Sequence, residues 1–394
     1  MKTNIQQNIP QGWELKALGD LGEFKTGGVD KKIKQDEQPV KLINYMDVYR
    51  HKFIDRSINF MEVTANEGEI ESSQVKIGDM LFTPSSETHD DIGHSAVVVE
   101  NLPNTLFSYH LARLRFNEVY NKKINLNFRA YFCNSRLVLK QFEKMSVGAT
   151  RYTISKGKFE SIQVLIPSSN IEQRKIAEIL GAVDEDIAKT QDVIDATEKL
   201  KRGLMQQLFT RGIGNAEFKT LRLGDLCIFQ TGKLNSNRAV SGGEYLFFTC
   251  SQETFEIDQY SFDQKAILLA GNNAAGKYSV KYYEGKFDAY QRTYVISIKN
   301  EDELSYPYLK EVLNTRLNEL RDSSVGSTTK FLTLKLLENL PISLPSITQQ
   351  REIAEILSTI NEKISINKKL KAKLTLLKRG LMQDLLSGNK RVKI

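Results

Sequence analysis

The stretch QRKIAEIL (173–180) recurs as QREIAEIL (350–357), 177 positions further along the chain. At the same offset LKRGLMQ (200–206) recurs unchanged at 377–383. Residues 173–208 and 350–385 share 17 identities in 36 positions without a gap. A self-similarity of this length indicates that the protein is built from two related halves.

Start and stop signals around both repeats predict long helices. Pro167 and Pro345 end the preceding segments, and Gly212 and Gly388 stand where a helix C-terminus needs a left-handed residue. Ser169 with Glu172, and Ser346 with Gln349, match the capping-box spacing at the N-termini. Each helix is expected to have about 37 residues, or roughly 55 Å at 1.5 Å per residue.

Apolar residues recur in both helices at alternating three- and four-residue steps, the period of a coiled-coil seam. The expected helix–helix seam includes Ile176, Leu180, Val183, Ile187, Ile353, Leu357, Ile360 and Ile364. Polar residues such as Thr190 and Asn367 interrupt it, which lowers stability but helps to fix register. Pairing each helix with its own repeat predicts an antiparallel coiled coil with pseudo-twofold symmetry. Gly203 and Gly380 indicate close approach of another backbone, a kink, or a tolerated exposed glycine near a fraying helix end.

The repeat extends outward into two unlike blocks. LGDLGEFKTG (18–27) corresponds to LGDLCIFQTG (223–232), and SVG (146–148) to SVG (324–326). Strand-like segments at 75–83, 95–100, 266–270, 277–285 and 293–298 accompany helical segments at 125–145 and 306–322, so each block is predicted to be a mixed α/β domain. The expected organisation is domain 1–166, long helix 167–212, domain 213–344, and long helix with a basic tail 345–394.

Composition narrows the functional classes. The net charge is +7, but residues 345–394 carry 11 Lys/Arg against 4 Asp/Glu and so account for all of it. Charge alone therefore supports nucleic-acid binding and a basic solvated tail about equally. The three cysteines are widely spaced, which excludes a disulfide framework or zinc ribbon and fits a reducing cytosol. The absence of an apolar run of about 18 residues argues against a membrane span, so a cytoplasmic location is expected.

Taken together, two dissimilar domains that each open with an LGD…TG segment, and each precede a QR-IAEIL…LKRGLMQ helix, resemble the specificity subunits of type I restriction–modification systems (HsdS). The resemblance covers about Trp13 to Gly388. It implies two target-recognition domains, each contacting one half of a bipartite asymmetric site in double-stranded DNA. It also implies a coiled coil that sets the spacer and docks two methyltransferase subunits, which restriction/translocase subunits then join. S-adenosylmethionine would belong to the methyltransferase partner and ATP with magnesium to the restriction partner, leaving no cofactor in this chain.

Catalytic motifs are incomplete. GNNAAGKY (271–278) fits the G-x-x-x-x-G-K pattern, but Tyr278 replaces the Ser/Thr that holds magnesium, and a strand-like segment follows where a P-loop needs a helix. A methyltransferase would need an Asn/Asp-Pro-Pro-aromatic segment, which the sequence lacks. The four histidines match no metal-ligand spacing, so neither a metal site nor catalysis is expected.

Candidate DNA contacts are polar residues in loops of the two blocks. Arg and Gln pair with guanine and adenine edges, whereas Lys and Thr more often hold phosphates. The loops 84–94 and 271–276 are the proposed equivalents, with a plain hairpin turn and ordinary surface polarity as the alternatives. The expected contacts are Lys25, Thr26, Ser85, Ser86, His89, Arg151, Tyr152, Asn272, Asn273, Lys277, Gln291, Arg292 and Lys330.

Two other functions are compatible with parts of the sequence, a structural adaptor and a stand-alone enzyme. A structural adaptor would use the paired helices to scaffold other proteins and would bind no specific DNA, but the two elaborate and divergent blocks argue against it. A stand-alone enzyme is disfavoured by the incomplete motifs. The sequence leaves open whether the partner system restricts DNA or only methylates it.

Overall fold

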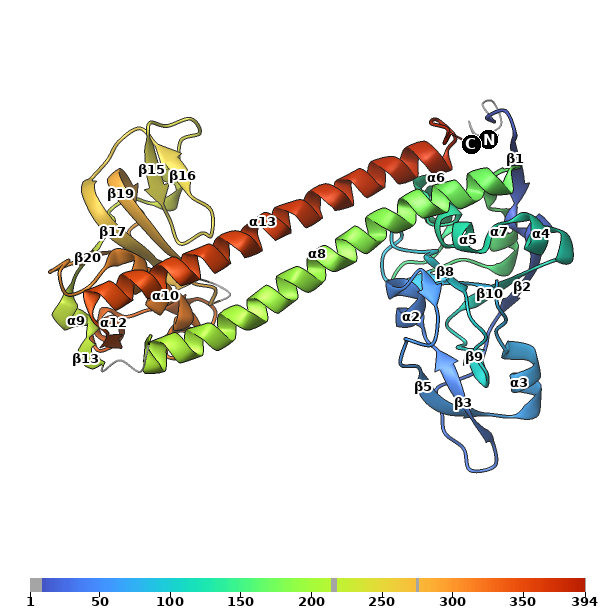
Figure 1. Cartoon of the computed structure of the whole chain (residues 1–394), viewed down its shortest axis with the longest axis horizontal. Coiled ribbons are helices and arrows are strands. Elements are labelled where there is room, and N and C mark those ends of the chain that lie inside the picture. Colours follow the sequence, from blue (N-terminus) through green and yellow to red (C-terminus); the bar gives the residue numbers. More distant parts are fainter. Residues whose placement is uncertain (1–8, 214–217, 274–275, 394) are drawn as a thin grey trace. The chain divides into compact units, whose positions relative to one another are not determined.

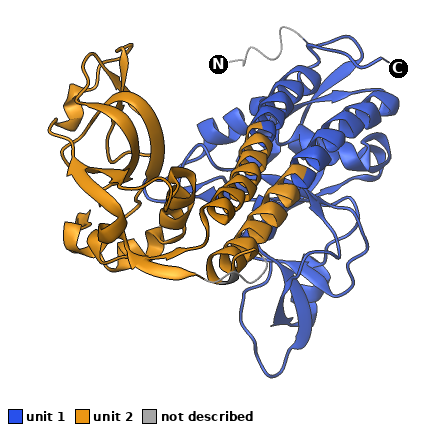
Figure 2. Ribbon diagram, turned by 60° about the vertical axis from the view of Figure 1, so that its left-hand side comes forward, with its two compact units in different colours: residues 1–189, 370–394 blue, residues 190–369 orange. Residues whose placement is uncertain are grey.

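The computed structural model describes residues 9–213, 218–273 and 276–393. The chain divides into two compact units, residues 1–189 with 370–394, and residues 190–369 (Figure 2). Two long helices are labelled in Figure 1, α8 (Asn170–Arg211) and α13 (Ile347–Leu386). Each has one end in the first unit and the other end in the second (Figure 2). The predicted mixed α/β architecture with two long repeated helices is confirmed.

The heptad seam is the face that both long helices turn away from solvent. Every seam position from Ile176 to Leu208 and from Ile353 to Leu385 is buried or half-buried. Ile176, Leu180, Ile353 and Leu357 are fully buried, and Val183, Ile187, Ile360 and Ile364 are half-buried. On α8 the polar seam positions Thr190 and Thr197 are themselves buried, whereas on α13 every seam position from Ile360 to Leu381 is half-buried.

Ion pairs within each unit define the direction of the helix pair. In the first unit Asp184 of α8 pairs with Lys378 of α13. In the second unit Glu198 of α8 lies 2.7 Å from the Nζ atom of Lys368. A later residue of α8 therefore meets an earlier residue of α13, which makes the coiled coil antiparallel, as predicted.

The capping box consists of two hydrogen bonds, one to the cap side chain and one returning to the cap backbone. The first is present at both helices as predicted, and the second is not. The backbone N–H of Glu172 donates to Ser169 Oγ at 3.4 Å, and that of Gln349 donates to Ser346 Oγ at the same distance. The Glu172 carboxylate, however, does not return to its cap residue, because it is buried and accepts two hydrogen bonds from Arg391, at 2.6 and 2.8 Å.

Gln349, the repeat equivalent of Glu172, donates instead to the carbonyl of Ile213, which follows α8. In each unit the third residue of one long helix thus holds the segment that leaves the other. Arg391 also donates to Gln11 O, so this part of the basic tail is anchored rather than freely solvated. The helices end where predicted, since Gly212 and Gly388 have φ angles of 66° and 72°.

A buried glutamine joins each domain to its long helix. Gln173 accepts from the backbone N–H of Asn125 at 2.7 Å and donates to the carbonyls of Lys123 and Pro167. Its side chain is inaccessible to solvent. Because a buried backbone group left without a partner costs about 1–3 kcal/mol, one amide that serves three such groups explains why this position is glutamine.

Gln350 makes the same three hydrogen bonds in the second unit. It accepts from the backbone N–H of Ser305 and donates to the carbonyls of Glu303 and Pro345. The repeated QR sequence thus encodes a joint between helix and domain. Gly203 and Gly380, by contrast, have open space around the position of a Cβ atom, so within the described residues they are exposed glycines and not sites of close approach.

The globular part of the first unit contains a five-stranded sheet in the order β2-β10-β6-β8-β4 and a three-stranded sheet in the order β5-β3-β9. Strands β1 and β12 form an antiparallel pair that leads into α8. The bounds are β1 Trp13–Ala17, β2 Gly22–Thr26, β3 Gln38–Ile43, β4 Phe53–Ile54, β5 Met61–Ala65, β6 Met80–Phe82, β8 Ser95–Val98, β9 Thr105–Phe107, β10 Ala112–Phe116 and β12 Gln163–Pro167, with helices α1 Leu18–Leu21, α2 Tyr45–Arg50, α3 Glu67–Ser73, α4 Glu118–Lys123, α5 Leu126–Phe132, α6 Arg136–Met145 and α7 Lys156–Ser161.

The second unit contains a six-stranded sheet in the order β14-β20-β17-β19-β15-β16. The pair β13–β22 leads into α13, as β1–β12 leads into α8. The bounds are β13 Lys219–Arg222, β14 Cys227–Thr231, β15 Tyr245–Phe248, β16 Phe255–Ile257, β17 Phe262–Ala270, β19 Val280–Ala289, β20 Thr293–Ile298 and β22 Pro341–Leu344, with helices α9 Leu223–Leu226, α10 Tyr306–Thr315, α11 Leu317–Asp322, α12 Leu334–Glu338 and a 3₁₀ turn Ser236–Arg238.

Several predicted elements are shorter than expected. The segment 125–145 is two helices and not one, because Ser135 caps a new helix, α6, by accepting from the N–H of Val138. The segment 306–322 is likewise divided at Arg316. Only Met80–Phe82 of 75–83 is a strand, since Gly78 has a φ of 90° that an extended strand does not adopt.

Candidate nucleic-acid interface

In the first unit a two-residue strand pair gathers several of the predicted contacts. Strand β7 (Ser85–Ser86) pairs antiparallel with β11 (Tyr152–Thr153), which places Ser86 opposite Tyr152. Arg151 precedes β11 and donates from its guanidinium to Ser85 Oγ at 3.1 Å. His89 is exposed, with its ring 5.7 Å from that of Tyr152. Five predicted residues, 85, 86, 89, 151 and 152, therefore lie together.

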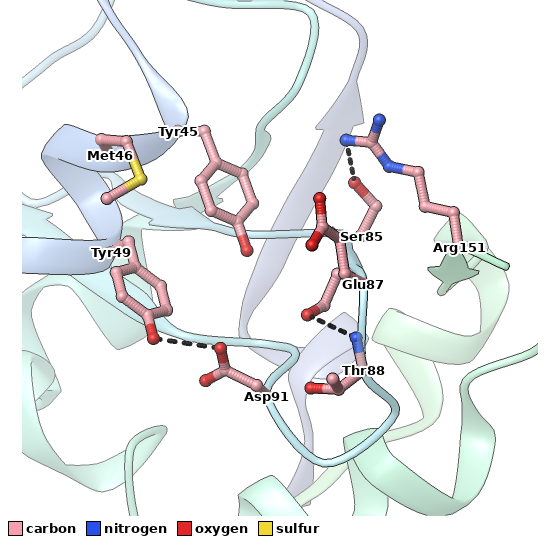
Figure 3. A pocket seen from close by; sticks show the side chains of 9 residues that line it. Tyr45, Met46, Tyr49, Ser85, Glu87, Thr88, Asp91 and Arg151 are labelled. Atoms are coloured by element: carbon pink, nitrogen blue, oxygen red, sulfur yellow. Dashed lines mark hydrogen bonds between the residues drawn. The ribbon is translucent and has the colours of Figure 1, made fainter. Parts of the chain in front are cut away.

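Next to this strand pair is an open pocket of about 400 Å³. Figure 3 shows Tyr45, Tyr49, Arg151 and the loop residues Glu87 and Asp91 around it. The two tyrosine rings stack with centroids 6.0 Å apart. Burial raises the pKa of Tyr45, so its hydroxyl stays protonated at neutral pH and can donate a hydrogen bond.

The tyrosines come from α2, which the sequence analysis did not predict. Asn44 precedes this helix, and the two rings stand one helical turn apart at i and i+4. An asparagine cap followed by YMDVYR is the signal that was available for a short helix with an aromatic face. Met46 also lines the pocket, so one face of α2 supplies its apolar wall.

Asp91 is held in place by two neighbours. Tyr49 donates its hydroxyl hydrogen to Asp91 Oδ2 at 3.0 Å, and His94 Nε2 lies 2.7 Å from Asp91 Oδ1. The hydrogen bond to Asp91 raises the pKa of Tyr49. An oriented carboxylate of this kind can accept from the exocyclic amino group of cytosine.

Lys25 and Thr26 lie at the end of β2, opposite Arg113 and Ala112 of β10. Burial, followed by the charge of Arg113, lowers the pKa of Lys25. Within the described part of the chain no hydrogen bond or ion pair joins these two residues to the β7–β11 pair. The structure therefore does not group them with the other expected contacts, and their role in binding DNA stays a prediction.

The second unit repeats the two-residue strand pair. Strand β18 (Asn272–Asn273) pairs antiparallel with β21 (Lys330–Phe331), so that Asn273 lies opposite Lys330. The backbone N–H of Lys277 donates to Asn273 Oδ1 at 3.3 Å, and the Lys277 side chain is exposed. Residues 274 and 275, inside this loop, lie outside the described residues.

Gln291 and Arg292 border the same strand pair. The Arg292 guanidinium lies over the Phe331 ring, 5.8 Å from its centroid, and the Arg292 carbonyl accepts from the N–H of Gly271. Gln291 donates to Asn235 Oδ1 at 3.0 Å. All six predicted contacts of the second domain are therefore in or beside one patch, and Asn235 is the member that the sequence analysis missed.

We call the β7–β11 pair and the β18–β21 pair, each with its bordering residues, the two patches. The pairing register makes them equivalent. Ser85 and Ser86 correspond to Asn272 and Asn273, and Tyr152 corresponds to Lys330. The repeated SVG sequence produces this equivalence, because Val147 bridges to Thr153 and Val325 bridges to Phe331. Gly148 and Gly326 have positive φ angles, and a Cβ atom at either position would collide with the carbonyl three residues later.

The two patches differ in chemistry. The first combines Arg151 with the carboxylates of Glu87 and Asp91. The second carries asparagine amides with Lys277, Lys330 and Arg292. Carboxylates can accept from cytosine N4, asparagine can pair with adenine, and arginine can pair with guanine, so two surfaces of this composition would prefer different bases on contact with DNA.

Strand β19, and not a helix, follows GNNAAGKY, so the feature that a P-loop needs is missing. Across residues 9–213, 218–273 and 276–393, no three His, Cys, Asp or Glu side chains are grouped as metal ligands. No helix in these ranges has the length and apolarity needed to cross a membrane.

Comparison with known proteins identifies the family. A model of the type I restriction modification DNA specificity domain matches residues 10–198 and again 215–376, once for each half of the repeat. The chain belongs to this family of DNA specificity subunits.

Individual relatives agree with this assignment. The chain is 38% identical over 155 residues to the EcoDI specificity subunit of Escherichia coli, which is 39% of this chain and a third (33%) of that subunit. It is 24% identical to a putative MjaX specificity subunit of Methanocaldococcus jannaschii over 100% of this chain and 96% of the relative. The crystal structure of the type I S subunit from M. genitalium has the same fold, with a TM-score of 0.65, 17% identity and coverage of 98% of both chains.

Proposed function

We propose that this chain is the DNA-recognition subunit of a type I restriction–modification complex and has no catalytic activity of its own. The domains 1–166 and 213–344 each contact one half of a bipartite, asymmetric site in double-stranded DNA. The helices 167–212 and 345–394 connect them and set the spacer. The observation that carries the proposal is the pair of equivalent strand patches, β7–β11 and β18–β21, with unlike side chains.

An asymmetric DNA site requires two recognition surfaces that occupy equivalent positions in their domains but carry different side chains. Two weak half-site interactions on one connected protein act as a single strong one, because the second binding event is intramolecular. We assign the base contacts to Ser85, Ser86, His89, Arg151 and Tyr152 in the first domain and to Asn272, Asn273, Lys277, Gln291, Arg292 and Lys330 in the second. Lys25 and Thr26 are proposed to hold phosphates.

The docking site for the methyltransferase subunits is proposed to be a second apolar stripe on the long helices. Ile179, Val193 and Leu200 lie seven residues or a multiple of seven apart on α8, and each is between 38% and 56% exposed. Their repeat equivalents on α13, Ile356, Leu370 and Leu377, are between 37% and 51% exposed. We name these six residues the outer stripe. Its occurrence once on each helix supports two copies of the same partner.

The remaining assignments follow from the role of the subunit. S-adenosylmethionine would bind to the methyltransferase partner, and ATP with magnesium to restriction/translocase subunits that join the core. Such a complex acts on chromosomal and invading DNA, which supports a cytoplasmic location.

The test of the function is a methylome. The chain is co-expressed with its methyltransferase partner in a host that lacks DNA methylation, and modified bases are mapped by single-molecule sequencing. One bipartite, asymmetric motif that disappears when this chain is omitted is the expected result. Assembly with an active methyltransferase but without any new motif would favour the adaptor function instead.

Variants of the two patches sharpen this test. Arg151→Ala is expected to relax specificity in one half of the motif only, because loss of a bidentate base contact costs about 1–3 kcal/mol at that position. Asn272→Ala is its matched control and is expected to relax the other half. A change in both halves from either variant would contradict the assignment of one domain to one half-site.

The outer stripe gives a separate prediction about assembly. Leu200→Asp is expected to remove one methyltransferase subunit from the complex, and Leu200→Asp with Leu377→Asp to remove both, because truncating or charging a central apolar anchor costs 2 kcal/mol or more. Native mass spectrometry of the co-expressed complex measures the stoichiometry.

Leu376→Asp is the matched control for the outer stripe. Leu376 is 59% exposed and adjoins Leu377, but it is not one of the six stripe residues. Full assembly of the Leu376→Asp variant and partial assembly of the Leu200→Asp variant are expected. Equal loss from both variants would contradict a defined docking stripe.

A further inference from the structure

The two long helices differ in charge although they are repeats. The α13 segment 363–379 carries seven Lys or Arg residues and no Asp or Glu. The equivalent α8 segment, 186–202, carries four basic and four acidic residues. A charge difference of this size inside a repeat that is otherwise well preserved indicates a function that only one of the helices performs.

Two of the seven cations in this α13 segment form ion pairs with residues of α8. Lys368 pairs with Glu198, and Lys378 pairs with Asp184. Lys369 and Lys373 are different, because both are exposed and, among the described residues, neither forms an ion pair. They stand four residues apart, which places them on adjacent turns of one helix face.

This face is separate from the two surfaces already described. Lys369 and Lys373 each follow a seam position, Asn367 and Lys371, by two residues. Two residues correspond to roughly 200° around an α-helix, so both ammonium groups lie on the side opposite the seam. They are not members of the outer stripe.

The ligand of this face has to be an anion that is present once in the complex. A partner that docks in two copies would use features common to both helices, whereas the α8 equivalents of these lysines are Asp192 and Ala196. The duplex is the single-copy polyanion of the proposed complex, with one negative charge per roughly 1.7 Å. We propose that Lys369 and Lys373 of α13 bind the phosphate backbone of the bound DNA, without contact to its bases. This inference rests on the proposed function.

The test measures the salt dependence of DNA binding. The complex of this chain with its methyltransferase partner is titrated with a duplex that contains its methylated motif, at several salt concentrations. Lys369→Gln with Lys373→Ala is expected to make the slope of log K against log [salt] shallower by about 2, since each phosphate contact contributes about 0.9. The affinity is expected to fall by about tenfold to a hundredfold near 0.1 M salt, equally for target and non-target sequences.

Lys199→Gln is the matched control. Lys199 is an exposed lysine on α8 that also follows a seam position, Thr197, by two residues. It is expected to leave the slope within the error of the wild-type value. The Lys369/Lys373 variant is expected to fold, because α8 carries no cation at the two equivalent positions and is nevertheless helical there.

Three outcomes would overturn the inference. An unchanged slope with intact sequence-specific binding would remove it and leave the proposed function standing. Weaker assembly with the methyltransferase subunit, at unchanged DNA affinity of the assembled complex, would assign the lysines to a protein contact. A wild-type complex that binds no DNA would overturn both the inference and the proposed function.

Discussion

Replacement of Asp184 by alanine is expected to lower the free energy of unfolding of the first unit by about 2–4 kcal/mol. Asp184 lies on α8 and accepts hydrogen bonds from Lys52 at 2.6 Å, from the Tyr131 hydroxyl at 3.1 Å and from Lys378. It therefore ties the first domain, α8 and α13 together through one carboxylate. Removing it leaves two ammonium groups facing each other in a half-buried site.

The pKa shifts of Asp184 and Lys52 show that burial and ion pairing oppose each other in this cluster. Burial alone would raise the pKa of Asp184, but the hydrogen bonds from Lys378 and Lys52 outweigh burial and lower it below its usual value. Burial lowers the pKa of Lys52 to about 8 despite the adjacent carboxylate. Without that carboxylate the pKa of Lys52 would fall further.

The pH dependence has a definite sign. A carboxyl group whose pKa is lower in the folded state contributes stability above its unfolded pKa of about 4, and this contribution is lost as pH falls through the folded value. Acidification below about pH 4 should therefore destabilise the wild type more steeply than Asp184→Ala. Urea unfolding, followed by circular dichroism at a series of pH values, measures both effects.

Asp192→Ala is the control for this substitution. Asp192 is exposed on the same helix, and a change there is expected to alter stability by no more than about 0.5 kcal/mol. Equal stabilities of the Asp184 and Asp192 variants would show that the three-way contact contributes nothing net.

Duplication of one heptad in both long helices is expected to lengthen the DNA spacer of the methylated motif by one to three base pairs. The heptads 186–192 of α8 and 370–376 of α13 suit this experiment, because the antiparallel register fixed by Asp184 and Lys378 makes them opposite each other. Seven helical residues add about 10 Å. This length equals about three base pairs at 3.4 Å each.

The helical twist of DNA sets the lower bound of the expected increase in spacer length. Each added base pair turns the second half-site by about 34–36° around the duplex, since a turn takes 10–10.5 base pairs. A heptad changes the facing direction of a supercoiled helix pair very little. Length therefore favours three extra base pairs and rotation favours fewer. The methylome of the duplicated variant reports the spacer directly.

Duplicating only one of the two heptads is the matched control. It shifts one helix against the other and breaks the seam, so loss of methylation is expected rather than a new spacer. An unchanged spacer in the double duplication would rule out the helix pair as the ruler between half-sites.

The long helices and their pairing could be predicted because they are governed by local and periodic signals. The heptad pattern from Ile176 to Leu208 and from Ile353 to Leu385 identified the buried face, and Gly212 and Gly388 identified the ends. The capping box failed at its second step because Arg391, 219 residues away along the chain, outcompetes the local backbone for the Glu172 carboxylate. Competition of that kind depends on tertiary structure and leaves no local sequence pattern.

The candidate interface was predicted as a set of residues but not as a geometry. The loops 84–94 and 271–276 were recognised as equivalent from their place between strands. That each forms a two-residue strand pair with the segment after SVG depends on long-range pairing, Ser86 with Tyr152 and Asn273 with Lys330. Helix α2 was missed because six residues give too few turns for a periodicity to be measured.

The glutamine joints have a consequence for how such a protein acquires new targets. Gln173 and Gln350 hold their domains only through main-chain groups, those of Lys123 and Asn125 in one case and of Glu303 and Ser305 in the other. Main-chain amides and carbonyls are the same whatever side chains surround them. A foreign domain that brings its backbone to the same place would meet a compatible connector, so evolution can exchange whole recognition cassettes while the connecting helices and everything assembled on them stay unchanged.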